Sequence, residues 1–293
     1  MTSYIALGLT ALARTAELTG NAGFRTWFTG HNGAAVIAGA FLLEHEAMNE
    51  KSRALITKKL DKIIAENKTY FVPFEKAKTV SLTALLKAIE QNCSKLSTSG
   101  HGVIYGTLAL RALKVFPEMA TAPLMQGLTN MLEITQSDNP ARYFGVDDYN
   151  EYETPLEEQD LSLAVQRAYR MSCGNLFDNQ EIAGKYYFFV GEKIHAITHA
   201  QALHSLSLLG YPVLAQIGLH SLNRQLELNA LYPNGPASGD ELPLNLFDGS
   251  FWSQEFKDPH SIKLAYSAIE LNLTFGDEVI PLENLGHQFA LLH

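Results

Sequence analysis

The spacing of apolar residues constrains the fold of this chain more than any other feature. Apolar side chains recur every three or four residues in nearly every segment longer than ten residues, while alternating strand patterns are scarce. This spacing places one apolar stripe along a helix. We therefore expect an all-α protein of about 10 to 12 helices. The predicted helices are 3–18, 33–48, 50–66, 79–93, 101–114, 119–134, 156–172, 182–209, 211–230, 259–272 and 281–291.

The chain is expected to form a single domain, 1–293, arranged as a toroid-like array of helices around a central cavity. With 293 residues, 46% of them hydrophobic, it can bury one large core. Two segments, 137–158 and 232–258, interrupt the helical pattern with Gly, Pro and acidic residues. Long connections in compact domains often cover a site. We therefore expect both segments to form lids or walls of the cavity.

Four histidines occur in similar settings, each before a run of small and apolar residues that predicts a helix. They are His31, His101, His195 and His260. The runs after His31 and His101 look like diverged copies of one unit, and inner helices that begin at a common rim would bring such side chains together. The positive end of a helix dipole also lowers the pKa of a histidine and keeps it neutral, as a base or metal ligand must be. We predict that these histidines form a catalytic centre.

A candidate metal site lies within the predicted helix 182–209, where Glu192, His195 and His199 are spaced i, i+3 and i+7. These positions share one helix face, so two imidazoles can hold an iron or zinc ion while the carboxylate ligates or orients them. The alternative is that these histidines act as bases on a phenolic substrate without metal. The chain has no HExxH, CxxC, Walker, nucleophile-elbow or dinucleotide-binding motif.

Further candidates would bind the substrate or its developing charge. Phe251 and Trp252 lie in the segment 232–258, where an aromatic pair suits a pocket for a flat apolar molecule. Tyr105 and Tyr266, in predicted inner helices, are the other substrate-binding candidates. A lysine one turn after His260 would stabilise negative charge. The predicted catalytic residues are therefore His31, His101, His195, His199, His260 and Lys263.

Two short blocks carry a family resemblance. Residues 194–203 read Ile-His-Ala-Ile-Thr-His-Ala-Gln-Ala-Leu, and residues 258–268 read Asp-Pro-His-Ser-Ile-Lys-Leu-Ala-Tyr-Ser-Ala. Both resemble the questin oxidase-like family, and the block around His31 is similar more loosely. The resemblance implies a helical oxidoreductase that opens a polyketide-derived aromatic quinone by Baeyer–Villiger-type oxygen insertion, with NADPH as electron donor. It also implies that His195, His260 and Lys263 are pocket residues, with His31 and His101 beside them.

Other functions stay open. An α/α-barrel lyase, isomerase or cyclase would use a histidine as proton carrier, with Asp147, Asp148 or Glu192 nearby. The glycine-rich helix starts near His31 and His101 faintly resemble those of lanthionine cyclase-like barrels. That resemblance implies a zinc site of two cysteines and one histidine, but the two cysteines of this chain have no Cys–His neighbour. A non-catalytic helical-repeat scaffold would explain the helix pairs by itself.

Charge and cysteine content indicate the partners and the compartment. The formal net charge is -9 and no long basic block occurs, so we expect no nucleic-acid partner. No apolar run approaches the ~20 residues that cross a bilayer, so we expect no membrane partner. Two cysteines, Cys93 and Cys173, with no framework spacing favour a cytoplasmic protein. We expect a small-molecule substrate and leave a homodimer open.

Overall fold

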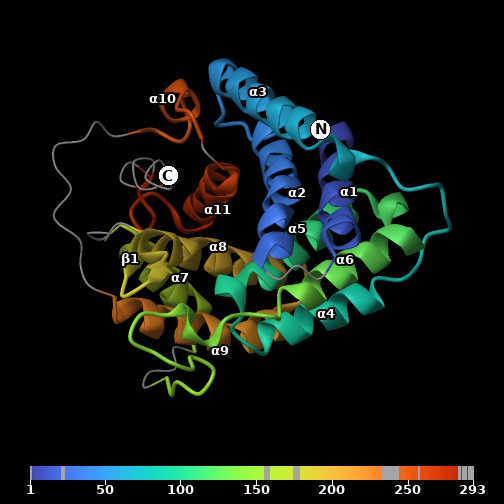
Figure 1. The fold of residues 1–293 in the computed structure, drawn as a ribbon. Coiled ribbons are helices and arrows are strands. Elements are labelled where there is room, and N and C mark those ends of the chain that lie inside the picture. The colour runs from blue at the N-terminus through green and yellow to red at the C-terminus, as the bar shows by residue number, and fades with distance from the viewer. Residues whose placement is uncertain are drawn as a thin grey trace.

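The computed structural model describes residues 2–20, 24–154, 159–173, 179–232, 244–256 and 258–282, together with 285 and 289. Within these ranges the protein is all-α apart from one short hairpin, as predicted (Figure 1). Its helices are α1 (Thr2–Thr19), α2 (Phe24–Leu43), α3 (Glu50–Glu66), α4 (Thr83–Cys93), α5 (His101–Val115), α6 (Ala122–Ile134), α7 (Leu161–Ser172), α8 (Phe189–Leu208), α9 (Pro212–Ala230), α10 (Gly249–Trp252) and α11 (His260–Phe275). Strands β1 (Gln180–Ile182) and β2 (Lys185–Tyr187) pair antiparallel.

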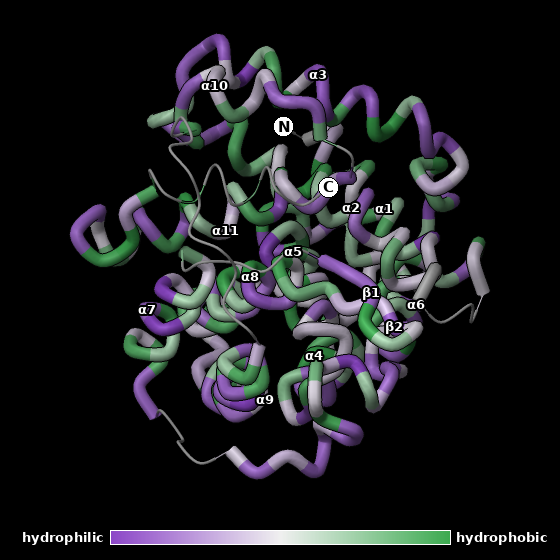
Figure 2. The backbone as a smooth tube through the Cα atoms, turned by 60° about the vertical axis from the view of Figure 1, so that its left-hand side comes forward, coloured by the Kyte–Doolittle hydropathy of each residue, from purple (hydrophilic) through white to green (hydrophobic). Residues whose placement is uncertain are grey.

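Helices α2, α5, α8 and α11 pack against one another in the interior. α8 contacts α5, α7, α9 and α11, and α2 contacts α1, α3, α5 and α11 (Figure 1). One apolar core cluster contains residues from Ile5 in α1 to Phe289 near the C-terminus. The outer helix α3 is largely hydrophilic in Figure 2, and buries Ser52, Ile56 and Leu60. A closed ring of helices around a central cavity stays a prediction.

A close crossing between α1 and α2 positions the helix that carries His31. A Cβ atom added at Gly33 would lie 2.5 Å from the backbone nitrogen of Leu12 and 2.7 Å from the carbonyl oxygen of Gly8. Real Cβ atoms do not approach this closely, so the two backbones can only meet where side chains are absent. The two helices can therefore cross this closely because Gly8 and Gly33 meet at the crossing.

Two predicted helix boundaries near the histidines are wrong. We expected a helix to begin at residue 33, but α2 begins at Phe24, so His31 lies about two turns inside it. Gly30 lies inside this helix at a close packing contact, where an added Cβ would meet Met131 Cε at 2.5 Å. We also expected a helix from residue 182, but the turn Ala183–Gly184, with positive φ at both residues, closes the β hairpin.

Because α8 begins only at Phe189, His195 also lies inside a helix. The helix-dipole argument therefore applies to His101 and His260, which begin α5 and α11, and not to the other two. The predicted helices 79–93, 119–134 and 156–172 also begin a few residues later than expected, at Thr83, Ala122 and Leu161. Most of the predicted helix 281–291 lies outside the described residues. Across the described part of the chain, no helix combines the length and apolar character needed to cross a membrane.

Candidate functional site

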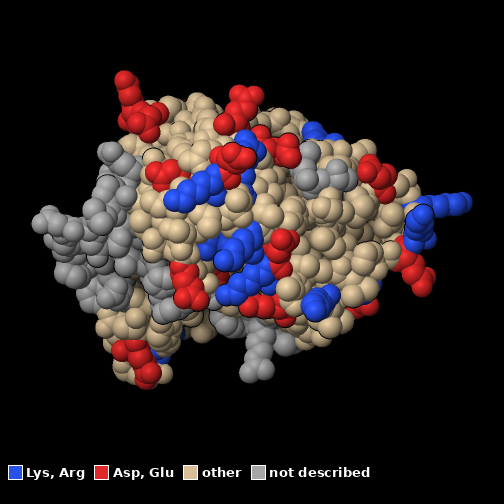
Figure 3. Space-filling model, turned by 90° about the horizontal axis from the view of Figure 1, so that it is seen from above, with Lys and Arg blue, Asp and Glu red and all other residues tan. Residues whose placement is uncertain are grey.

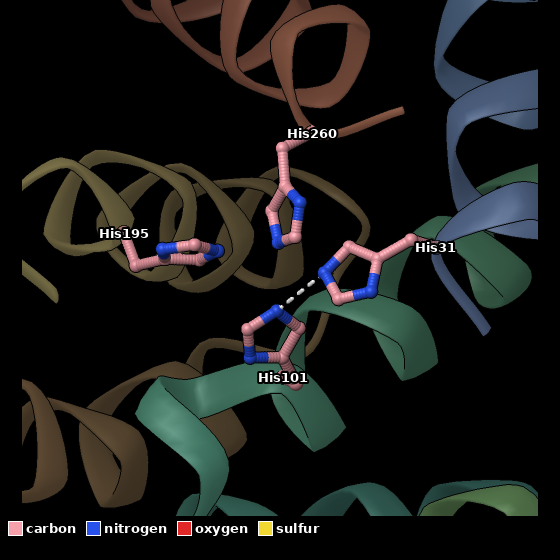
Figure 4. A group of neighbouring side chains, drawn as sticks. All are labelled: His31, His101, His195 and His260. Carbon is pink, nitrogen blue, oxygen red and sulfur yellow. Dashed lines mark hydrogen bonds between the residues drawn. The ribbon is translucent and has the colours of Figure 1, made fainter. Parts of the chain in front are cut away.

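Four histidines from four helices meet in the interior of the protein. We call them the histidine cluster: His31 from α2, His101 from α5, His195 from α8 and His260 from α11 (Figure 4). One ligand nitrogen of each ring lies within 4.8 Å of those of the other three. All four side chains are buried.

The Nδ1 atom of every ring in the cluster faces an oxygen acceptor. The four pairs are His31 with Phe28 O at 2.6 Å, His101 with Thr98 O, His195 with Gly191 O at 2.5 Å, and His260 with Asp258 Oδ1 at 2.7 Å. An oxygen acceptor at Nδ1 requires the proton there, so a neutral ring carries its lone pair on Nε2. Histidine ligands of metals are oriented in this same way by their surroundings.

The Nε2 atoms of His31 and His101 face each other with no ring proton between them, and the donor beside them is Lys263 Nζ, 3.2 Å from His101 Nε2. His31 Nε2 and His101 Nε2 lie 2.8 Å apart, although both rings have an acceptor at Nδ1 (Figure 4). His195 Nε2 is buried and has no hydrogen-bond partner among the described residues. Two lone pairs at this distance repel unless a proton or a cation lies between them. The donor set thus fits a metal ion that prefers imidazole nitrogen, such as iron, zinc or copper.

Electrostatics keep the cluster neutral. Burial is the largest cause that lowers the pKa of each of the four rings, and the nearby ammonium group of Lys263 lowers it further. For His260 alone, Asp258 opposes this shift. Lys263 is itself buried, with Nζ 3.2 Å from His101 Nε2, and burial lowers the pKa of its amine to about 7. Neutral imidazoles are the form that binds metal.

A left-handed turn positions His101. Thr98, Ser99 and Gly100 all have positive φ, of 45°, 55° and 80°, directly before α5. The turn is held by a hydrogen bond of 2.6 Å from Thr98 N to Asp138 Oδ2. It aims the Thr98 carbonyl at His101 Nδ1. Such strained backbone persists where surrounding contacts hold it, and it is frequent at functional sites.

A cavity of about 590 Å³ opens beside the cluster. Its lining includes the rings of His101, His195 and His260. Trp27 and Phe28 give it an aromatic wall, and aromatic residues of the β hairpin and its exit lie at its rim. The other residues that line it are Ser99, Ser137, Asp138, Asn139, Arg142, Asn179, Lys185, Tyr186, Phe188, Gly191, Glu192 and Asp258. We call this space the main cavity.

The two expected lid segments contribute unequally. In 137–158, the residues that line the main cavity are Ser137, Asp138, Asn139 and Arg142. In 232–258, Asp258 lines it, while residues 233–243 and 257 lie outside the described part of the chain.

The predicted metal triad on α8 is not assembled. Glu192 binds Arg142 and Ser99, at 2.7 and 2.8 Å through Oε1, and is not one of the four clustered residues. His199 turns toward α9, where its Nδ1 lies 2.8 Å from Gln225 Oε1, and burial lowers its pKa to about 4. Residues at i, i+3 and i+7 share a face, but Glu192 and His199 are bound by other parts of the chain and are held apart from His195. The cluster therefore takes one histidine from each helix.

The four aromatic residues expected to bind substrate are placed differently. Tyr105 lies against the cluster, where its hydroxyl donates to Trp27 O and contacts His31 Nδ1, both at 2.9 Å. Tyr266 is buried, and its hydroxyl oxygen accepts a hydrogen bond from Arg111. Neither lines the main cavity.

Phe251 and Trp252 were predicted to form walls of the substrate pocket. Both belong to the apolar core, and neither lines the main cavity. The indole of Trp252 donates to Leu246 O at 2.8 Å, which satisfies its one polar atom internally. Trp252 does line a second cavity, of about 470 Å³, which shares Phe28 and Asp258 with the first.

On the face seen in Figure 3, basic side chains lie among acidic ones.

Several residues of the site were not predicted from the sequence. Arg142 joins two carboxylates in the cavity wall, Trp27 packs on His101 with ring centroids 4.9 Å apart, and Lys185 lines the cavity from the hairpin. Asp258 could have been found from the sequence. An aspartate two residues before the first residue of a helix can accept hydrogen bonds from that residue, here from the backbone nitrogen and the Nδ1 atom of His260. The other three are brought in by packing between distant segments.

Comparison with known proteins found no matching family model, no matching curated protein and no matching solved structure. The resemblance to the questin oxidase-like family therefore stays a prediction.

Proposed function

We propose that the histidine cluster binds one divalent metal ion, and that the protein is a metal-dependent oxidoreductase acting on an aromatic or otherwise apolar small molecule. The observation that carries the proposal is the 2.8 Å approach of His31 Nε2 to His101 Nε2, with an oxygen acceptor at both Nδ1 atoms. A bridging cation would turn this repulsion into ligation. The unsatisfied Nε2 of His195 supports the same conclusion.

The size of the cluster agrees with a single ion. Imidazole nitrogens bind zinc at about 2.0–2.1 Å in a tetrahedral arrangement, so two ligand nitrogens of one ion are about 3.4 Å apart. The ligand nitrogens of the cluster lie within 4.8 Å of one another. Rotations of the rings that bring the more distant nitrogens together would therefore complete the site. Asp258 at His260 and the backbone carbonyls at the other rings would supply the outer hydrogen bonds that orient metal ligands.

The main cavity indicates a small-molecule substrate. Its volume of about 590 Å³ lies within the usual range of ligand pockets, roughly 300–1,000 Å³. Trp27 and Phe28 offer flat apolar surfaces next to the cluster. An iron or copper ion at this place would supply redox chemistry with dioxygen. The resemblance adds oxygen insertion into an aromatic ring, with NADPH as electron donor, and the free cysteines Cys93 and Cys173 suit a cytoplasmic protein.

Metal analysis tests the proposal. The protein would be purified without a metal-affinity tag and its iron, zinc and copper measured, before and after incubation with Fe(II) and Zn(II). We expect about one ion per chain in the wild type and almost none in a His31→Ala/His101→Ala variant. His220→Ala, at an exposed position on α9, is the matched control and should keep the metal. A wild-type protein that neither contains nor takes up metal would overturn the proposal.

A metal-free lyase, isomerase or cyclase is the second candidate. It is favoured by the contact of 2.7 Å between His260 Nδ1 and Asp258 Oδ1, which pairs a base with an orienting carboxylate. Under this alternative the metal analysis finds no ion in the wild-type protein. His260→Gln then abolishes turnover through the loss of the base.

A further inference from the structure

One carboxylate oxygen beside the histidine cluster is unsatisfied. Glu192 is 3% exposed and lines the main cavity, one helical turn before His195. Its Oε1 accepts hydrogen bonds from Ser99 Oγ at 2.8 Å and from Arg142 Nη1 at 2.7 Å. Its Oε2 is buried and has no hydrogen-bond partner among the described residues. A buried carboxylate oxygen without a donor costs free energy, so a ligand that supplies one gains affinity.

Arg142 and Ser99 determine which oxygen is left over. Both donate to Oε1, so rotating the carboxylate would break two hydrogen bonds in order to satisfy one. Arg142 is held in turn by Asp138, with Nε 2.7 Å from Oδ2 and 2.9 Å from Oδ1. The orientation of Glu192 is thus set before any ligand arrives, as preorganised recognition requires.

The charge balance indicates the kind of partner. One guanidinium, Arg142, serves two carboxylates, Asp138 and Glu192. Together these three side chains keep an excess negative charge, which attracts a hydrogen-bond donor and repels an acceptor. A carboxylate is an acceptor on both oxygens. The missing partner is therefore an O–H or N–H group that fits beside aromatic walls.

We infer that Glu192 Oε2 accepts a hydrogen bond from a hydroxyl group of the substrate, so that the main cavity selects hydroxylated aromatic molecules. The inference rests on the proposed function for the role of the cavity and adds the residue that recognises the hydroxyl. Trp27 and Phe28 contact the ring, while Glu192 holds the hydroxyl on the side of His195. A molecule with an ether oxygen in that place meets the carboxylate with an acceptor and is rejected.

Binding of 2-naphthol and of its methyl ether, 2-methoxynaphthalene, tests the inference, since the ether has a methyl group in place of the hydroxyl proton and cannot donate a hydrogen bond. Each is titrated by calorimetry into the wild-type protein, both as purified and after metal removal. We expect 2-naphthol to bind at least about tenfold more tightly, the usual size of a hydrogen bond to a charged group. Equal affinities, or no binding of 2-naphthol, would overturn the inference.

The variant Glu192→Gln assigns the preference to one residue. Ser99 and Arg142 should hold the amide oxygen in the place of Oε1, which leaves the amide NH₂ in the place of Oε2. The preference should then vanish or reverse, and a retained tenfold preference would contradict the inference. Glu133→Gln, the same change at an exposed position on α6 outside the cavity lining, is the control and should keep the preference. If Glu192→Gln does not fold, the wild-type comparison of the two ligands decides alone.

Metal content separates this inference from the proposed function. Glu192 is not one of the four clustered residues, so Glu192→Gln should keep the metal while losing the hydroxyl preference. A wild-type protein without metal that still prefers 2-naphthol would overturn the proposed function and leave the inference standing.

Discussion

His31 Nε2 and His101 Nε2 lie 2.8 Å apart in the protein interior, although the two residues are far apart in the chain and come from different helices. Both rings are neutral by virtue of burial, which lowers the pKa of each well below its usual value. Their Nδ1 atoms already face carbonyl oxygens. This arrangement places two unprotonated ring nitrogens against each other, and four expectations follow from the pair and its surroundings.

Metal should stabilise the fold. A ligand present at about 100 times its dissociation constant stabilises the native state by about 2.7 kcal/mol. For a domain of this size we expect the melting temperature to rise by roughly 5 °C or more. Scanning calorimetry of chelator-treated protein, with and without Fe(II) or Zn(II), measures the shift. The His31→Ala/His101→Ala variant should show none, and an equal shift in that variant would place the metal elsewhere.

Asp258→Asn should weaken metal binding by about 10- to 100-fold, as is common for the partners of metal-bound histidines. The carboxylate accepts the Nδ1 proton of His260 at 2.7 Å, and an amide is a weaker acceptor. Competition with a chromogenic chelator measures the affinity. Asp148→Asn, at an exposed position, should leave it unchanged. Equal affinities for the two variants would show that Asp258 does not orient a ligand.

Gly100→Ala should cost more stability than Gly145→Ala. Both glycines have positive φ, 80° and 75°, so both substitutions carry a backbone penalty of about 1–2 kcal/mol. Around Gly145 no atom of the described residues beyond its chain neighbours lies within 4 Å of an added Cβ, whereas at Gly100 the Cβ would meet the His199 ring at 2.6 Å. Overpacking adds about 1–3 kcal/mol there. Urea unfolding measures both, and equal losses would mean that the His199 ring can move aside.

The stability of the protein should fall as pH falls from about 6.5 toward 4, in part because of His199. Burial lowers the pKa of this ring to about 4, while in the unfolded chain it is about 6.5. Between these values the unfolded chain binds a proton that the folded ring does not, so the free energy of unfolding decreases with falling pH. The contribution of the neutral His199 ring to the free energy of unfolding is fully present above about pH 6.5. It is lost as the pH falls to about 4, and the loss amounts to about 3 kcal/mol.

The variant His199→Asn isolates that contribution. Asparagine keeps a donor for Gln225 Oε1 but does not titrate. Urea unfolding of both proteins across the window should give a shallower pH dependence for the variant. The cluster histidines titrate in both, so parallel curves would show that His199 is not the cause.

Local sequence was enough to predict the fold class and most helices. Apolar spacing depends only on residues within a few turns, and that is also what makes a helix amphipathic. The helix that starts at His101 was predicted at the correct residue, and the one that starts at His260 was predicted one residue early. The pattern failed at the predicted helix start at residue 33, because α2 already begins at Phe24 and its Gly30 makes room for Met131 and Tyr105.

The sequence by itself determined that this chain forms helices and which histidines lie on their inner faces. Only the tertiary structure decided that His31, His101, His195 and His260 meet while His199 turns to Gln225 and Glu192 binds Arg142. The reason is physical. Helical periodicity sets the face on which a side chain lies, but the meeting of side chains depends on the crossing and register of helices distant in sequence. Those are set by packing, which no local pattern contains.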